Sequence, residues 1–122
     1  IDDVMNPSIF RLSAFEMGQY ADFKEIVCLV ADGNYSFIYL SDGRSLVVSK
    51  CLECLEQHLP QDSFLRIHKS YLINPDFVEC IFHKKIKLTN GTVYAVSRRR
   101  WRQIHLYFKQ KMRTKKVIVE AI

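Results

Sequence analysis

Residues that interrupt regular structure are scarce in this sequence, which has only four Gly and three Pro among its 122 residues. Low-complexity tracts and internal repeats are missing as well. This composition excludes disordered and fibrous proteins, which depend on such tracts or on a low apolar content. Hydrophobic residues make up 48% of the chain and charged residues 25%. The sequence therefore predicts one globular domain over residues 1–122, built around one core.

A long apolar run is also absent. The longest run, Ile26 to Ala31, is far shorter than the roughly 20 residues that cross a bilayer. No charged and then apolar leader precedes a small-residue cleavage site. We therefore expect a soluble, cytoplasmic protein without a membrane partner. Ile1 stands where an initiator Met would be, so we also expect a longer protein with a further domain upstream.

Sequence motifs of catalysis are missing too. The chain has no Gly-x-Ser-x-Gly elbow, no glycine-rich phosphate loop and no His-Glu-x-x-His helix. Its four His are scattered over expected helices and strands. We therefore expect neither enzymatic activity nor a cofactor.

The cysteines form the one pattern that suggests a metal. Cys51 and Cys54 have the CxxC spacing, and Cys80 with His83 could supply two further zinc ligands. However, the CxxC pair falls inside an expected helix rather than a tight knuckle, and residues 80 and 83 of one strand would point to opposite faces. We therefore expect no metal site. All four cysteines, Cys28 included, are interpreted as reduced core or boundary residues.

Alternating apolar and polar residues, with Asp-Gly and Asn-Gly turns between them, dominate the chain up to residue 96 and predict antiparallel strands. The strands are expected at residues 10–14, 26–31, 35–40, 46–48, 64–67, 71–73, 77–82, 86–88 and 93–96. Phe37 is expected in the core. Residues 113–122 fit a strand, a fraying tail or a contact with another domain, and the sequence leaves these alternatives open.

Two short helices complete the expected fold. The first has leucines at three- and four-residue spacing, follows Ser49, which can cap it, and ends at Pro60. The second is a C-terminal amphipathic helix with Ser97 as its expected N-cap. Its apolar face comprises Trp101, Ile104 or His105, Phe108 and Met112. The expected fold class is therefore mainly β, with a few short helices.

Charge is distributed unevenly along the chain. Residues 1–62 hold four Lys or Arg against ten Asp or Glu, and residues 63–122 hold fourteen against three. Clustered cations repel one another, but they gain Coulomb energy and release counterions when they meet phosphates. The asymmetry therefore indicates a polyanionic partner, with a solvated basic surface as the alternative.

Arginines are concentrated where the last expected strand turns into the C-terminal helix. Arg98, Arg99, Arg100 and Arg102 crowd this junction. Cations at a helix N-terminus oppose the helix dipole, so stability alone does not predict them. A phosphate or a guanine edge would offset this cost, because Arg binds guanine O6 and N7 with two hydrogen bonds. The alternative is again a solvated run of charge.

The run FLRIHKSYLIN, residues 64–74, places His68, Lys69 and Ser70 as a polar turn between two apolar arms. The alternative reading is a turn held by Ser and His hydrogen bonds. Together with IVCLVADGNYSFIYLSDG upstream and YAVSRRR downstream, this run resembles the LytTR-type DNA-binding domain over residues 10–110. The resemblance implies an elongated arrangement of small antiparallel sheets. It also implies the output half of a bacterial response regulator, joined to a receiver domain.

The resemblance further implies that loops on one edge read DNA, two in successive major grooves and one across the intervening minor groove. By position, the first loop is Asn34, Tyr35 and Ser36, the second is His68, Lys69 and Ser70, and the third is Ser97 with Arg98, Arg99 and Arg100. The expected function is sequence-specific binding of double-stranded DNA, by a chain that is monomeric alone and binds as two copies at tandem repeat sites.

Two other functions remain open at this point. The chain could be a non-enzymatic protein-interaction module, or a zinc-stabilised one, whose basic rim is only solvated surface. Alternatively, Tyr35, Phe37 and Tyr39 could form an exposed stacking platform for single-stranded nucleic acid. The platform requires all three rings to face solvent.

Overall fold

The computed structural model describes residues 9–11, 20–60, 62–111 and 118–119. The strands are β1 (Ile9–Arg11), β2 (Tyr20–Asp22), β3 (Ile26–Asp32), β4 (Tyr35–Leu40), β5 (Ser45–Val48), β6 (Leu65–His68), β7 (Tyr71–Ile73), β8 (Val78–Phe82), β9 (Lys85–Leu88), β10 (Val93–Ala95) and β11 (Ile118–Val119). The helices are α2 (Leu52–His58) and α3 (Arg98–Lys111), and two short 3-10 turns cover Phe23–Glu25 and Pro75–Phe77. The expected mainly-β class with a C-terminal helix is confirmed.

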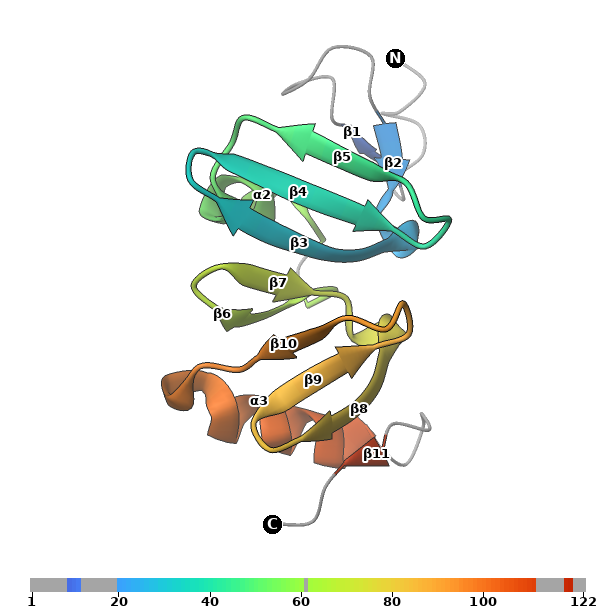
Figure 1. The fold of residues 1–122 in the computed structure, drawn as a ribbon. Helices are drawn as coiled ribbons and strands as arrows, with labels where there is room; N and C mark the ends of the chain where they lie inside the picture. Colours follow the sequence, from blue (N-terminus) through green and yellow to red (C-terminus); the bar gives the residue numbers. More distant parts are fainter. Residues whose placement is uncertain (1–8, 12–19, 61, 112–117, 120–122) are drawn as a thin grey trace.

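A five-stranded antiparallel sheet occupies the upper half of the molecule in Figure 1, with the strand order β5-β4-β3-β7-β6. Strand β3 pairs with β4 through the tight turn at Gly33, whose φ of 62° suits glycine. On its other side β3 pairs with β7. The first strand of the chain, β1, pairs only with β2 in a separate two-stranded sheet. Of the strand expected at residues 10–14, residues 12–14 lie outside the described part of the chain.

A second sheet lies below the first in Figure 1, in the order β10-β9-β8-β11. Strands β8, β9 and β10 are antiparallel neighbours, whereas β11 runs parallel to β8. Helix α3 buries Ile104 and Phe108, and it half-buries Trp101. These residues recur at helical spacing, so the expected amphipathic face is confirmed as far as Phe108. Met112 lies outside the described residues.

The described residues form two apolar clusters rather than the single core expected from the sequence. One cluster packs α2 against a face of the five-stranded sheet, and the other joins the opposite face to the second sheet and α3. Strand β3 serves both clusters because its side chains alternate between the two faces, and a β-bulge between Ile26 and Cys28 places the consecutive Val27 and Cys28 on the same face. Ile26 and Leu29 join the first cluster, whereas Val27 and Cys28 join the second.

Three local expectations differ from the structure. Helix α2 begins after Cys51, which makes no side-chain cap hydrogen bond, so Ser49 lies too early to cap it. Phe37 is half-buried and stacks on Tyr39 with ring centroids 6.5 Å apart, because the opposite side of β4 faces the core. Ser97 does immediately precede α3, yet in the described part of the chain its buried Oγ makes no hydrogen bond.

Cys28 is fully buried, and its thiol donates to the Tyr94 hydroxyl at 3.8 Å. Burial raises the pKa of Cys28 from 9.0 to about 11, although the Tyr94 contact lowers it in part. The folded protein thus holds this proton more tightly than the unfolded chain. The resulting stabilisation is complete below pH 9 and is lost as the pH rises through 11.

We therefore expect the free energy of unfolding of Cys28→Val to decrease less at alkaline pH than that of the wild-type protein. Between about pH 8 and about pH 11, the wild-type free energy of unfolding should fall by about 2 kcal/mol more than that of the variant. Urea denaturation at both pH values measures this difference. Both proteins carry Tyr94→Phe in the measurement, because Cys28 also raises the pKa of Tyr94. Parallel losses in the two proteins would contradict the assigned burial of the thiol.

Candidate nucleic-acid interface

The three loops singled out in the sequence lie along one edge of the molecule, at the left of Figure 1. The β3–β4 turn carries the first loop (residues 34–36), the β6–β7 turn carries the second loop (68–70), and the β10–α3 connection carries the third loop (97–100). Backbone hydrogen bonds join their bases. The Ala31 amide donates to the Ser70 carbonyl at 2.9 Å, and the Ser97 amide donates to the Ile67 carbonyl at 2.9 Å. One continuous edge therefore presents all three loops.

The first loop exposes only part of what the sequence assigned to it. Asn34 is exposed, and Tyr35 is 53% exposed at the tip of the hairpin. Ser36 is 0% exposed, and its hydroxyl donates to the Lys50 carbonyl at 2.7 Å. The Ser36 hydroxyl is therefore satisfied inside the sheet and is not exposed for the predicted DNA contact. Phe37 lies beyond the loop and is half-buried, so an exposed platform of three rings is not present.

The second loop is a rigid turn that exposes one cation. Lys69 is exposed at its tip, whereas His68 and Ser70 are half-buried. The Ser70 amide donates to His68 Nδ1 at 3.1 Å, and the His68 ring lies 4.8 Å from the Tyr71 ring. The reading of a turn held by Ser and His hydrogen bonds thus describes the local structure. It leaves Lys69 as the residue of this loop that can reach outward.

Arg66 supports the second loop, and the sequence analysis did not single it out. Its Nε donates to the His68 carbonyl at 2.7 Å and its Nη2 to the Lys69 carbonyl at 2.5 Å. Its Nη1 binds the Glu56 carboxylate of α2 at 2.9 Å. The signals in the sequence were its place in the FLRIHKSYLIN run, which resembles the family, and a charged residue between the apolar Leu65 and Ile67 of a strand.

The third loop carries most of the positive charge at this edge. Arg98, Arg99 and Arg102 are exposed. Arg100 is half-buried, and its Nη1 donates to the Arg66 carbonyl at 3.4 Å. Burial lowers the pKa of Arg100, the charges of Arg99 and Arg66 lower it further, and Glu56 raises it. Arg100 is therefore directed toward the second loop more than its neighbours are.

The β8–β9 turn adds cations beside the third loop that the sequence did not indicate. His83 and Lys84 adopt positive φ angles of 49° and 58°. The Val96 amide donates to the Lys84 carbonyl at 2.9 Å, which fixes this turn against the chain just before Ser97. Lys84 and Lys85 are exposed. The expectation that residue 83 lies on a strand is wrong, because the chain reverses there.

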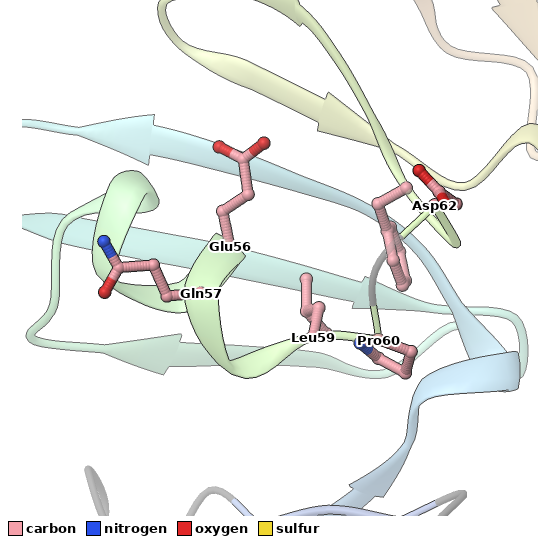
Figure 2. A pocket seen from close by; sticks show the side chains of 6 residues that line it. Glu56, Gln57, Leu59, Pro60 and Asp62 are labelled. Atoms are coloured by element: carbon pink, nitrogen blue, oxygen red, sulfur yellow. The ribbon is translucent and has the colours of Figure 1, made fainter.

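Other kinds of site find less support in the described residues. No group of three or more His, Cys, Asp or Glu side chains there is placed to hold a metal ion. Within the same ranges, no helix is long and apolar enough to cross a membrane. A cavity of about 410 Å³ lies at the end of α2 (Figure 2). Its described lining is Glu56, Gln57, Leu59, Pro60, Asp62 and Phe64. With two carboxylates and no cation in that lining, it does not suit a polyanion.

Known proteins resemble this chain in sequence and in fold. A 58-residue segment, 48% of the chain, is 36% identical to the CO-responsive transcriptional regulator RcoM of Rhodospirillum rubrum. That segment makes up 24% of RcoM, so the chain matches about a quarter of this curated relative. The solved structure of a LytTr DNA-binding domain from Bacillus cereus, described as part of a methyl-accepting/DNA response regulator, superposes with a TM-score of 0.60. It covers 77% of this chain and 86% of that one at 22% identity.

The family comparison spans most of the chain. The model of the LytTr DNA-binding domain family matches residues 20–109, which include β3 through α3 and all three loops. The resemblance seen in the FLRIHKSYLIN run is therefore confirmed, and the match extends well beyond that run. By this match, the chain belongs to the LytTR family of DNA-binding domains.

Proposed function

We propose that this chain binds double-stranded DNA in a sequence-specific manner, as the output domain of a bacterial transcriptional regulator. The observation that carries the proposal is the alignment of three turns along one edge, with exposed cations at the second and third. Family membership supports DNA as the partner. Binding, rather than catalysis, is the function of this edge, because its exposed groups are cations and a tyrosine at turn tips.

Two of the loops, one of them the third loop with Arg98, enter successive major grooves, and the remaining loop crosses the minor groove between them. Side chains at the tips read bases, because the major groove presents a distinct set of donors and acceptors for each base pair. Tyr35, Lys69 and Arg98 occupy these tips and are exposed. Asn34 assists at the first loop. His68 and Ser70 shape the second loop and contact DNA through its backbone.

Phosphate contacts supply most of the affinity. Arg99, Arg102, Lys84 and Lys85 are exposed around the third loop and can neutralise backbone charge. Arg100 is half-buried, so it contacts phosphate only at the border of this group of cations. This division assigns sequence discrimination to the loop tips and general attraction to the surrounding cations.

The biological setting follows from the same proposal. Two copies bind tandem repeat sites, each copy covering about one helical turn. The chain is monomeric without DNA and works in the cytoplasm, where the chromosome is accessible. In the full-length protein, a receiver or another sensory domain controls it.

Substituting Arg98 separates base reading from charge. If Arg98 holds a guanine edge with two hydrogen bonds, Arg98→Ala should cost about 1 to 3 kcal/mol on the preferred duplex and much less on random duplex. Arg98→Lys should recover only part of the discrimination, because an ammonium lacks the planar fork. Arg102→Ala is the matched control and should weaken both duplexes alike. Equal losses on both duplexes for Arg98→Ala would reduce this residue to a phosphate contact.

Salt titration measures the phosphate contacts. With about six contacts, the logarithm of the association constant should fall with the logarithm of salt concentration with a slope near −5. Replacing both Lys84 and Lys85 with Gln should reduce the magnitude of this slope by about 2. A wild-type slope near zero would contradict binding through phosphates. An unchanged slope in the double variant would remove the β8–β9 turn from the interface.

Stoichiometry is tested by sedimentation. We expect a monomer in the absence of DNA and two bound copies on a duplex that carries two sites in tandem, spaced by a whole number of turns. Shifting the spacing by about half a turn should weaken the second binding event, since the copies would then face opposite sides of the duplex. A tight dimer without DNA would contradict this arrangement.

A further inference from the structure

Arg66 of β6 joins the β6–β7 turn to helix α2. Two of its nitrogens donate to the carbonyls of His68 and Lys69, which are consecutive residues of the β6–β7 turn. A third nitrogen, Nη1, binds Glu56 of α2 at 2.9 Å. The Glu53 carboxylate lies 4.0 Å from Nη2. One guanidinium therefore ties the second loop to a helix that belongs to the other side of the sheet.

The Arg66 side chain is not available to DNA. Only 10% of it is exposed, and each of its three nitrogens already has a partner within the protein. The carboxylates of Glu56 and Glu53 also balance its charge. Any effect of Arg66 on DNA binding must therefore pass through the residues that it holds.

The same strand anchors the third loop. The Ile67 carbonyl accepts from the Ser97 amide at 2.9 Å, and the Arg66 carbonyl accepts from Arg100 at 3.4 Å. Glu56 favours the charged form of Arg100 as well, so one carboxylate serves both arginines. The second and third loops thus depend on one segment of β6 for their relative position.

We propose that Arg66, together with Glu56, is a positioning residue that fixes the spacing of the second and third loops, so that Lys69 and Arg98 meet their bases on one duplex at the same time. This inference rests on the proposed function. Recognition at two points requires the side chains to be placed to within about 0.5 Å, and loops achieve this only with supporting hydrogen bonds. Lys could not replace Arg66, because a single ammonium cannot reach two carbonyls and a carboxylate in a planar fork.

The variant Glu56→Gln distinguishes positioning from simple charge. If only charge mattered, removing a negative group near the interface would raise affinity equally for every duplex. If Glu56 holds Arg66 in place, the ratio of random-duplex to preferred-duplex Kd should instead fall, by about threefold, even while binding to random DNA strengthens. The two explanations therefore predict different ratios for one substitution.

The experiment compares four variants with the wild-type chain on a duplex selected from random-sequence DNA and on an unrelated duplex. Arg66→Gln and Arg66→Lys should each lower the Kd ratio by about tenfold. Arg44→Gln is the matched control, because it removes the same charge and breaks the Arg44–Asp42 pair, at 2.8 Å, in the β4–β5 turn at the far edge. Its ratio should equal that of the wild-type chain. A thermal melt checks folding, and if Arg66→Gln does not fold, Glu56→Gln decides the question.

Hydrogen exchange without DNA provides a readout that does not depend on DNA recognition. The Ser97 and Ser70 amides, whose acceptors lie in β6 and the second loop, should exchange faster in the Arg66 variants than in Arg44→Gln. Unchanged exchange together with an unchanged Kd ratio would overturn the positioning role. A wild-type chain that does not discriminate between duplexes would instead contradict sequence-specific binding, while the exchange data still test the link between the loops.

Discussion

Burial of strand β3 on both faces is the constraint on which the rest of the structure depends. Its side chains alternate, so Ile26 and Leu29 face the cluster under α2, while the bulge places both Val27 and Cys28 toward the second sheet. Two layers that would otherwise be separate domains thus share one strand. Strand β3 also pairs with both β4 and β7. The β3–β4 turn and the β6–β7 turn therefore extend from strands of the same sheet. The first and second loops are thus attached to strands that pair with β3.

Much of this fold follows from local sequence patterns. Alternation and Asp-Gly or Asn-Gly turns located β3 to β10 to within one residue at each end, because such signals act between neighbours in the chain. Strand β2 was not predicted, and β11 lies in the segment that the sequence left open. These local patterns did not predict which side of β4 is buried. Aromatic rings on one side and Ser36, Ile38 and Leu40 on the other are both compatible with a core. In the structure the second side is buried, because Ile38 and Leu40 pack in the cluster with α2 and the Lys50 carbonyl accepts from the buried Ser36 hydroxyl.

The sequence predicted which loops form the candidate site, but not the hydrogen bonds and ion pairs that hold these loops in place. A family motif and a run of arginines indicated the three loops. The role of Arg66 depends on Glu56, ten residues earlier, and on Arg100, thirty-four residues later. No local pattern connects these residues, since strand pairing and helix packing bring them together. Lys84 was not predicted for the same reason. It lies beside the third loop because its carbonyl accepts a hydrogen bond from the Val96 amide, twelve residues later.

The residues proposed to read bases are distinct from the residues that hold the fold together. Tyr35, Lys69 and Arg98 project from turns whose geometry is maintained by other residues, so replacing them removes little buried surface. Mutations at these three positions are thus open to selection without loss of the folded state. A lineage of such regulators can acquire new operator preferences one substitution at a time, while the residues beneath the tips stay under constraint.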